Sequence, residues 1–317
     1  MKAHGPFRLA ICLGIGVVAA SITWVGQPPG SDWDEIWYTS RGLLRSEDPY
    51  AVGDSLHAAG WRYPLIYPGT AVVLAAPLAV LPLRASQSAW NGLGSAGVAW
   101  VLTAQGLWGL MALGSAAFLH ALLVVQWSPL LVAGLTAPWL GFVWAAKPTI
   151  GAALFVGWPS KQAFIGGVLL VLVSLAVIPD WPVKMWAGLW SAPHLIPIVA
   201  RPGGALLLLA LLRWRQPAAR MLAVLALVPH TTTPYEMLPL FLIPRTPREM
   251  ALLTLLSQVA FGLATTLRPG DLHQRLAETT AGQWPFWMGL VYFPALVMVL
   301  RLWPARSGRH WLVEKLP

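Results

Sequence analysis

The fold of this chain is decided by the stretch from Arg8 to Tyr50, RLAICLGIGVVAASITWVGQPPGSDWDEIWYTSRGLLRSEDPY. Its apolar first half predicts a membrane helix over residues 8–25, because about 20 apolar residues span the ~30 Å hydrocarbon layer. The QPPG that follows ends this helix, since proline cannot continue the backbone ladder. An acidic, aromatic segment comes next. The stretch therefore predicts a membrane helix followed by a polar loop on one side of the membrane.

The composition of the whole chain extends this prediction. Of its 317 residues, 57% are hydrophobic and 10% are charged, and such values lie outside the range of soluble globular domains. Further apolar segments follow the loop, several of them short and interrupted by proline. We predict an all-α fold, a polytopic transmembrane helix bundle of about 10–12 spans. It forms a single integral membrane domain over residues 1–317.

The distribution of positive charge predicts the orientation. The net charge of +9 is explained by the excess of Lys and Arg in cytoplasmic loops, so we expect no nucleic-acid partner. With the amino terminus in the cytoplasm, 13 of the 21 Lys and Arg, including Arg84, fall inside and 8 fall outside. This orientation places residues 27–68 outside. We expect a multi-pass protein of the plasma membrane whose active face is extracytoplasmic.

The loop at residues 27–68 holds half of the acidic residues of the chain. Six of the twelve lie there: Asp32, Asp34, Glu35, Glu47, Asp48 and Asp54. We interpret this loop as a catalytic or ligand-binding surface. Within it, residues 33–44 predict a short amphipathic helix that lies in the membrane interface, with Ser31 or Asp32 as its amino-terminal cap.

Motifs of several other chemistries are absent from the sequence. It contains no glycine-rich phosphate loop, no HExxH and no paired CxxC, and its single cysteine, Cys12, lies in the first apolar segment. Nucleotide chemistry and a structural zinc site are therefore unsupported. We read Cys12 as a small buried hydrophobic residue.

Several short motifs occur in order along the chain: Asp32-Trp33, EDPY at 47–50, YP at 67–68, PLAVLP at 77–82, Trp90 and Lys147-Pro148. In this order the chain resembles the polyprenyl-phosphate-sugar-dependent membrane glycosyltransferases of family 87, in the GT-C superfamily, which include bacterial mannosyltransferases. The resemblance is good over about residues 31–90 and loose afterwards, and YPG stands where the family usually has YPP. It implies a helix bundle of GT-C type in a bacterial plasma membrane.

The resemblance also implies a reaction. A hexose such as mannose would pass from a polyprenyl-phosphate donor to a hydroxyl of a lipid or glycan acceptor. The resemblance implies inversion at the anomeric carbon. By its position relative to EDPY, Asp32 matches the family's general base, and Asp34 is the alternative. The transfer requires one carboxylate that accepts the proton of the acceptor hydroxyl. A phosphate leaves without protonation, so no second acid is required.

The departing phosphate needs cationic partners. The candidates for binding the donor phosphate are Lys147, Arg201, His230, Arg41 and Lys184. The candidates for the substrate pocket are Tyr50, Tyr67 and Glu236. We expect no cofactor and no metal, with membrane lipids as further partners. The alternative is a hard cation held by Asp32, Asp34 and Glu35.

Structural roles compete with these functional ones. Asp32 could instead serve as a helix cap, and Asp34 and Glu35 could lie on a solvated face of the helix. Asp48 suits a turn with Pro49. The tyrosines are typical of residues that anchor a protein at the membrane interface. Lys and Arg side chains near the ends of spans can extend to water by snorkelling.

Two other classes of protein remain open. A secondary transporter would have broken helices and charged residues at mid-depth, and a non-catalytic assembly subunit would need only the spans. A glycosyltransferase predicts that Asp32 opens onto a cavity shared with Lys147, Arg201 or His230, with a lateral exit to lipid. A non-catalytic subunit predicts no cavity at Asp32.

Overall fold

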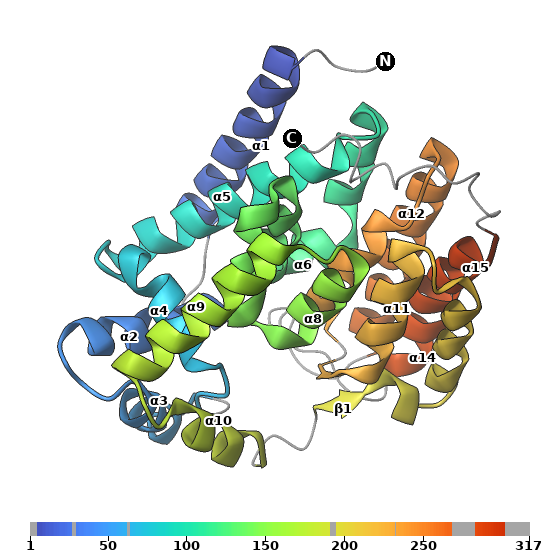
Figure 1. Ribbon diagram of the computed structural model, residues 1–317. Helices are drawn as coiled ribbons and strands as arrows, with labels where there is room; N and C mark the ends of the chain where they lie inside the picture. Colours follow the sequence, from blue (N-terminus) through green and yellow to red (C-terminus); the bar gives the residue numbers. More distant parts are fainter. Residues whose placement is uncertain are drawn as a thin grey trace.

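A computed structural model describes residues 5–26, 30–61, 64–190, 195–231, 233–267 and 283–301. Helices dominate this part of the chain, and a short antiparallel pairing joins Ile196–Pro197 (β1) to Pro229–His230 (β2). The all-α class predicted from the sequence is therefore confirmed. Figure 1 shows α2, α3, α10 and β1 together at the end of the molecule opposite the start of α1.

The first part of the chain forms α1 (Gly5–Gly26), α2 (Asp32–Leu44), α3 (Pro49–Ala58), α4 (Gly69–Ala79), α5 (Leu83–Leu102), η1 (Leu107–Gly114), α6 (Ala116–Leu123), α7 (Ser128–Ala133), η2 (Gly134–Thr136), η3 (Pro138–Ala146) and α8 (Pro148–Gly157). The later elements are α9 (Lys161–Val177), α10 (Trp181–Trp190), η4 (Ile198–Ala200), η5 (Gly204–Arg213), α11 (Pro217–Leu227), η6 (Pro234–Leu242), α12 (Pro247–Thr266), α14 (Trp284–Trp287), the π-helix η8 (Met288–Tyr292) and α15 (Phe293–Arg301). Proline stands in the first turn of many of them, where its missing N–H costs nothing.

The helices differ in their ability to cross a membrane. In the described residues, three are long and apolar enough: α1, α12 and the continuous helix Trp284–Arg301. Three bent pairs, α4 with α5, α6 with α7–η2, and α9 with α10, raise the number to six if each is one span. These helices are compatible with a multi-pass membrane protein. The predicted 10–12 spans exceed this number, because proline breaks the apolar sequence into pieces shorter than a bilayer.

Helices α1 and α5 lie side by side and antiparallel. A Cβ on Gly16 would come within 2.8 Å of the Gly92 carbonyl oxygen, so glycine permits this close approach. Small residues at such a crossing are typical of helices packed within a membrane. At the start of α1, Arg8 donates to the Thr103 hydroxyl just after α5, at 2.9 Å.

At the other end of this helix pair, the position of Arg84 differs from the prediction, which placed Arg84 on the side of the membrane opposite the first loop. Arg84, at the start of α5, donates to the carbonyl of Trp24 near the end of α1, at 2.8 Å. The Trp37 indole of α2 donates to the Leu81 carbonyl in the neighbouring turn, at 3.0 Å. Arg84 therefore lies on the side of the first loop and not opposite it. The bend of 111° between α4 and α5 is the reason, and the correction weakens the charge bias behind the orientation.

The short helix predicted over residues 33–44 is confirmed as α2, but the protein covers it. Trp33 and Ile36 are fully buried, and the Trp33 ring stacks on that of Trp90 at 3.9 Å. Aromatic pairs of this kind contribute more than their buried area alone. Helix α2 is thus packed firmly enough to hold its first residue, Asp32, in a fixed position.

Candidate functional site

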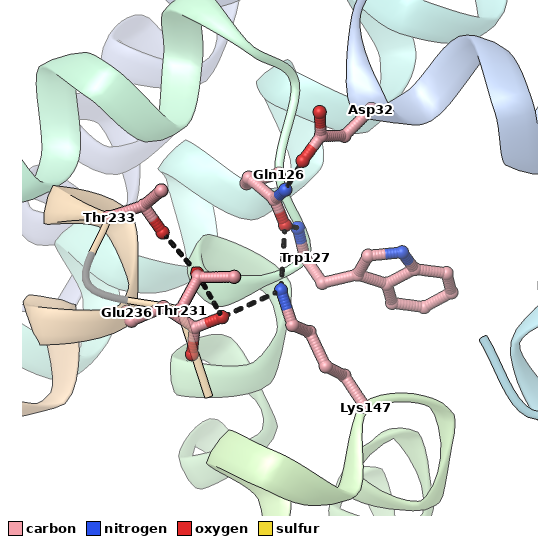
Figure 2. Close-up of polar contacts among 7 residues, drawn as sticks. All are labelled: Asp32, Gln126, Trp127, Lys147, Thr231, Thr233 and Glu236. Atoms are coloured by element: carbon pink, nitrogen blue, oxygen red, sulfur yellow. Dashed lines mark hydrogen bonds and ion pairs between the residues drawn. The ribbon is translucent and has the colours of Figure 1, made fainter. Parts of the chain in front are cut away.

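The side chain of Gln126 lies between Asp32 and Lys147 (Figure 2). Its Nε2 donates to Asp32 Oδ2, and its Oε1 accepts from Lys147 Nζ at 3.2 Å. Lys147 Nζ also lies 3.2 Å from Glu236 Oε1. We call Asp32, Gln126, Lys147 and Glu236 the central cluster.

Each member of the central cluster stands where a helix starts or stops. Asp32 is the first residue of α2, Gln126 lies between α6 and α7, and Glu236 lies in the first turn of η6. Lys147 has a non-helical backbone before Pro148 and separates η3 from α8, because a residue before proline is disfavoured in the helical region. The Asp32 N–H donates to the Val124 carbonyl at 3.1 Å and joins two of these ends. Helix breaks thus gather four polar side chains inside an apolar molecule.

The Lys147–Glu236 ion pair is buried. Lys147 is 8% exposed and Glu236 is 2% exposed, and the rings of Tyr67 and Tyr235 lie 5.7 and 4.6 Å from Lys147 Nζ. Glu236 Oε1 also accepts from the Thr231 hydroxyl at 3.4 Å. Glu236 Oε2 has no hydrogen-bond partner among the described residues. A buried charge without its counter-charge is strongly unfavourable, so each of the two holds the other in place.

Two carboxyl groups of α2 have raised pKa values. Burial raises the pKa of Asp32, while the Lys147 charge and the Gln126 hydrogen bond oppose the rise. Burial first, and then the Asp32 charge, raise the pKa of Glu35 well above its usual value. Protein surrounds Asp32, yet part of its surface stays exposed, and its Oδ1 forms no hydrogen bond within the described part of the chain. Asp32 can therefore accept a proton at Oδ1.

Four of the residues predicted from the sequence meet here: Asp32, Lys147, Tyr67 and Glu236. Their contacts are the ones described above. Arg201 lies over the Trp284 ring, 5.7 Å from its centre. The backbone of His230 pairs with Ile196, and the His230 side chain lies outside the described residues.

Two of the predicted phosphate-binding residues have other positions. Lys184 forms ion pairs with Asp48 and Asp180, at 2.5 and 2.6 Å on the surface. Arg41 lies near the other end of α2, over the ring of Trp37. Neither cation joins the central cluster.

Tyr50 and Asp48 support the site from outside. Burial raises the pKa of Tyr50, and its hydroxyl donates to the Tyr67 carbonyl at 2.7 Å. Asp48 caps α3 by accepting from the Tyr50 N–H at 3.0 Å, with Pro49 next to it. The turn predicted for Asp48 and Pro49 is confirmed, and Tyr50 positions the segment that carries Tyr67.

Asp34 is not on a solvated face, which corrects the expectation from the sequence. It is 2% exposed, and it accepts from the Gly30 N–H at 2.9 Å, from Gln87 Nε2 at 2.6 Å and from the Ser31 hydroxyl. The Asp34 carboxylate therefore accepts the hydrogen bonds at the start of α2, in place of the cap expected from Ser31 or Asp32. In the part of the chain that the structure describes, no three His, Cys, Asp or Glu lie close enough to hold a metal ion.

Gln126 and Tyr235 are members of the site that the sequence prediction missed. Gln126 is a polar residue within the apolar run VVQWSPLLV, and such an interruption is a signal of function in membrane segments. Val125 has a φ of 49°, a strained conformation for a β-branched residue. This strain turns the chain just before Gln126, and no sequence pattern announces it.

No family model, no curated protein and no solved structure matches this chain. The fold is helical and compatible with a multi-pass membrane protein, and the site is a buried, charged cluster at the broken ends of its helices.

Proposed function

We propose that this protein is an integral membrane glycosyltransferase of GT-C type. It moves a hexose such as mannose from a polyprenyl-phosphate donor to a hydroxyl of a lipid or glycan acceptor, on the extracytoplasmic face of a bacterial plasma membrane. The observation that carries the proposal is the connection of Asp32 through Gln126 to Lys147. One carboxylate and one cation, the two groups that this transfer requires, thus belong to one cluster.

The roles of the two groups follow from the chemistry. Asp32 Oδ1 takes the proton of the acceptor hydroxyl as its oxygen bonds to the anomeric carbon. The bond from that carbon to the phosphate oxygen breaks, and the phosphate keeps the electron pair. Lys147 then stabilises the charge that develops on the phosphate. The raised pKa of Asp32 makes its carboxylate a stronger base than an exposed aspartate.

The motif resemblance supports the same assignment. Asp32 and the Lys147-Pro148 pair belong to the motifs that resemble family 87, and they lie far apart in the sequence. Helix ends bring the two side chains to opposite sides of one glutamine (Figure 2). Glu236 and Tyr67 complete the walls around Lys147.

The test is transfer of radiolabelled sugar from polyprenyl-phosphate donors by membranes that contain the protein. Asp32→Asn should lower the rate by about 10²–10⁴, the usual contribution of a general base. The control is Asp54→Asn, an exposed aspartate on α3, which should transfer at the wild-type rate. A rate for Asp32→Asn within a few-fold of the control removes Asp32 as the base.

A proton-coupled transporter is the second candidate. The buried Lys147–Glu236 pair among broken helices favours it, because such pairs occur on proton pathways. Substrate uptake into vesicles that depends on a proton gradient, with no sugar transfer from any lipid donor, would decide for transport. A non-catalytic assembly subunit leaves this buried charge without a role.

A further inference from the structure

A surface hollow of about 580 Å³ lies at the carboxyl end of α2. Helices α2 and α3 and the turn between α4 and α5 surround it, at the end of the molecule where α2 and α3 lie in Figure 1. Its walls include Trp37, Tyr38, Arg41, Arg45 and Glu47. The hollow is separate from the central cluster, because Arg41 lies about 13 Å along the helix axis from the first residue of α2.

Two arginines give the hollow a positive wall. Arg41 and Arg45 are one helical turn apart and therefore share a face. Within the described residues, neither guanidinium has an ion-pair or hydrogen-bond partner, and neither bonds a carbonyl at the end of α2. Arg41 lies 4.8 Å from the Trp37 ring centre, which leaves the N–H groups at the edge of the guanidinium free. The two guanidiniums in this hollow therefore offer the charge-assisted hydrogen-bond donors that a phosphate group binds.

The rim of the hollow is apolar and is connected through Arg84 to a helix that could span a membrane. Val80 is 66% exposed and Leu44, next to the hollow, is 50% exposed. Arg84, which follows the wall residue Leu83, bonds the Trp24 carbonyl on α1. Helix α1 is long and apolar enough to span a membrane. The hollow thus offers cations beside a hydrocarbon surface, an arrangement that a free phosphate does not need.

We propose that this hollow binds the headgroup of an anionic phospholipid. Arg41 and Arg45 contact the phosphate, and the acyl chains lie along Val80 and the outer surface of α1. Trp37 and Tyr38 lie at headgroup level, where aromatic residues of membrane proteins concentrate. This binding does not depend on the proposed sugar transfer.

The test is lipid binding to the full purified chain in detergent, measured by native mass spectrometry. Phosphatidylglycerol and phosphatidylcholine are titrated against the wild type, against the double variant Arg41→Gln/Arg45→Gln, and against the matched control Arg215→Gln/Arg248→Gln. The control removes two exposed arginines, one just before α11 and one on α12, that do not line the hollow. The first variant should bind phosphatidylglycerol at least about tenfold more weakly. The control should bind it as the wild type does, and phosphatidylcholine binding should not change.

Two results would overturn the proposal. Unchanged phosphatidylglycerol binding by Arg41→Gln/Arg45→Gln removes the site, and displacement of the lipid by millimolar inorganic phosphate makes it a free-phosphate site. Among the described residues neither guanidinium has an ion-pair or hydrogen-bond partner, so the double variant loses only the contact between Arg41 and the Trp37 ring, and its unfolding midpoint should lie close to that of the wild type. If it is lower, the single change Arg45→Gln at an exposed position must still weaken phosphatidylglycerol binding, by a smaller factor.

Discussion

Lys147 Nζ lies 3.2 Å from Glu236 Oε1, with both side chains almost completely buried. We expect Lys147→Met to lower the free energy of unfolding by about 3–5 kcal/mol, because it leaves a carboxylate buried without its counter-charge. The double change Lys147→Met/Glu236→Leu should recover most of this loss, since it removes both charges. Thermal unfolding in detergent measures both. A double variant no more stable than the single one would show that the pair does not act as a unit.

Gln126 should set the pH at which sugar transfer begins. Gln126→Glu places a negative charge beside Asp32, which should raise the pKa of Asp32 further. The acidic limb of the transfer rate should then move to higher pH by the same amount. Gln87→Glu is the matched control, because Gln87 bonds Asp34 in the same way at 2.6 Å. A shift with Gln87→Glu and none with Gln126→Glu would assign the base to Asp34.

Glu35 should make the stability of the protein depend on pH. Burial raises its pKa in the folded chain, so the folded state holds the proton more tightly than the unfolded state does. Its contribution to stability is therefore present below the ordinary carboxyl pKa and is lost as pH rises through the raised value. Glu35→Gln should raise the unfolding midpoint at neutral pH but not at about pH 4. Asp54→Asn should have no such pH-dependent effect; equal curves for Glu35→Gln and wild type would contradict the prediction.

The close approach of α1 and α5 should depend on Gly16. A Cβ there would meet the Gly92 carbonyl oxygen at 2.8 Å, whereas a Cβ on Gly14 would meet nothing within 4 Å. Alanine favours helix equally at both positions, so Gly14→Ala serves as the control. Relative to it, Gly16→Ala should be less stable by about 1–3 kcal/mol, the usual cost of overpacking. Equal unfolding midpoints would mean that the two helices can move apart freely.

The sequence predicted those features that depend on local chemistry. Apolar runs indicated helices of membrane type, and amphipathic spacing indicated the helix confirmed as α2. Asp48 before Pro49 indicated the turn that now caps α3. Local residue preferences decide each of these within a few positions of the chain, so they can be read without the fold.

The charged residues show what the local sequence does not predict. Sequence position alone gave Arg41, Lys147 and Lys184 the same candidate role, but only Lys147 belongs to the central cluster. The other two cations serve a surface hollow and a surface ion pair. Asp34 looked solvated because it lies in an acidic loop, whereas contacts from α5 bury it.

The sequence by itself determined that this chain is helical, apolar and broken by proline, with its acidic residues concentrated after the first helix. Only the tertiary structure decided which polar groups meet. The bend between α4 and α5 and the strained backbone at Val125 direct distant helix ends toward one point. There Gln126 joins Asp32 to Lys147, because buried polar groups must find partners and the nearest ones come from other helices.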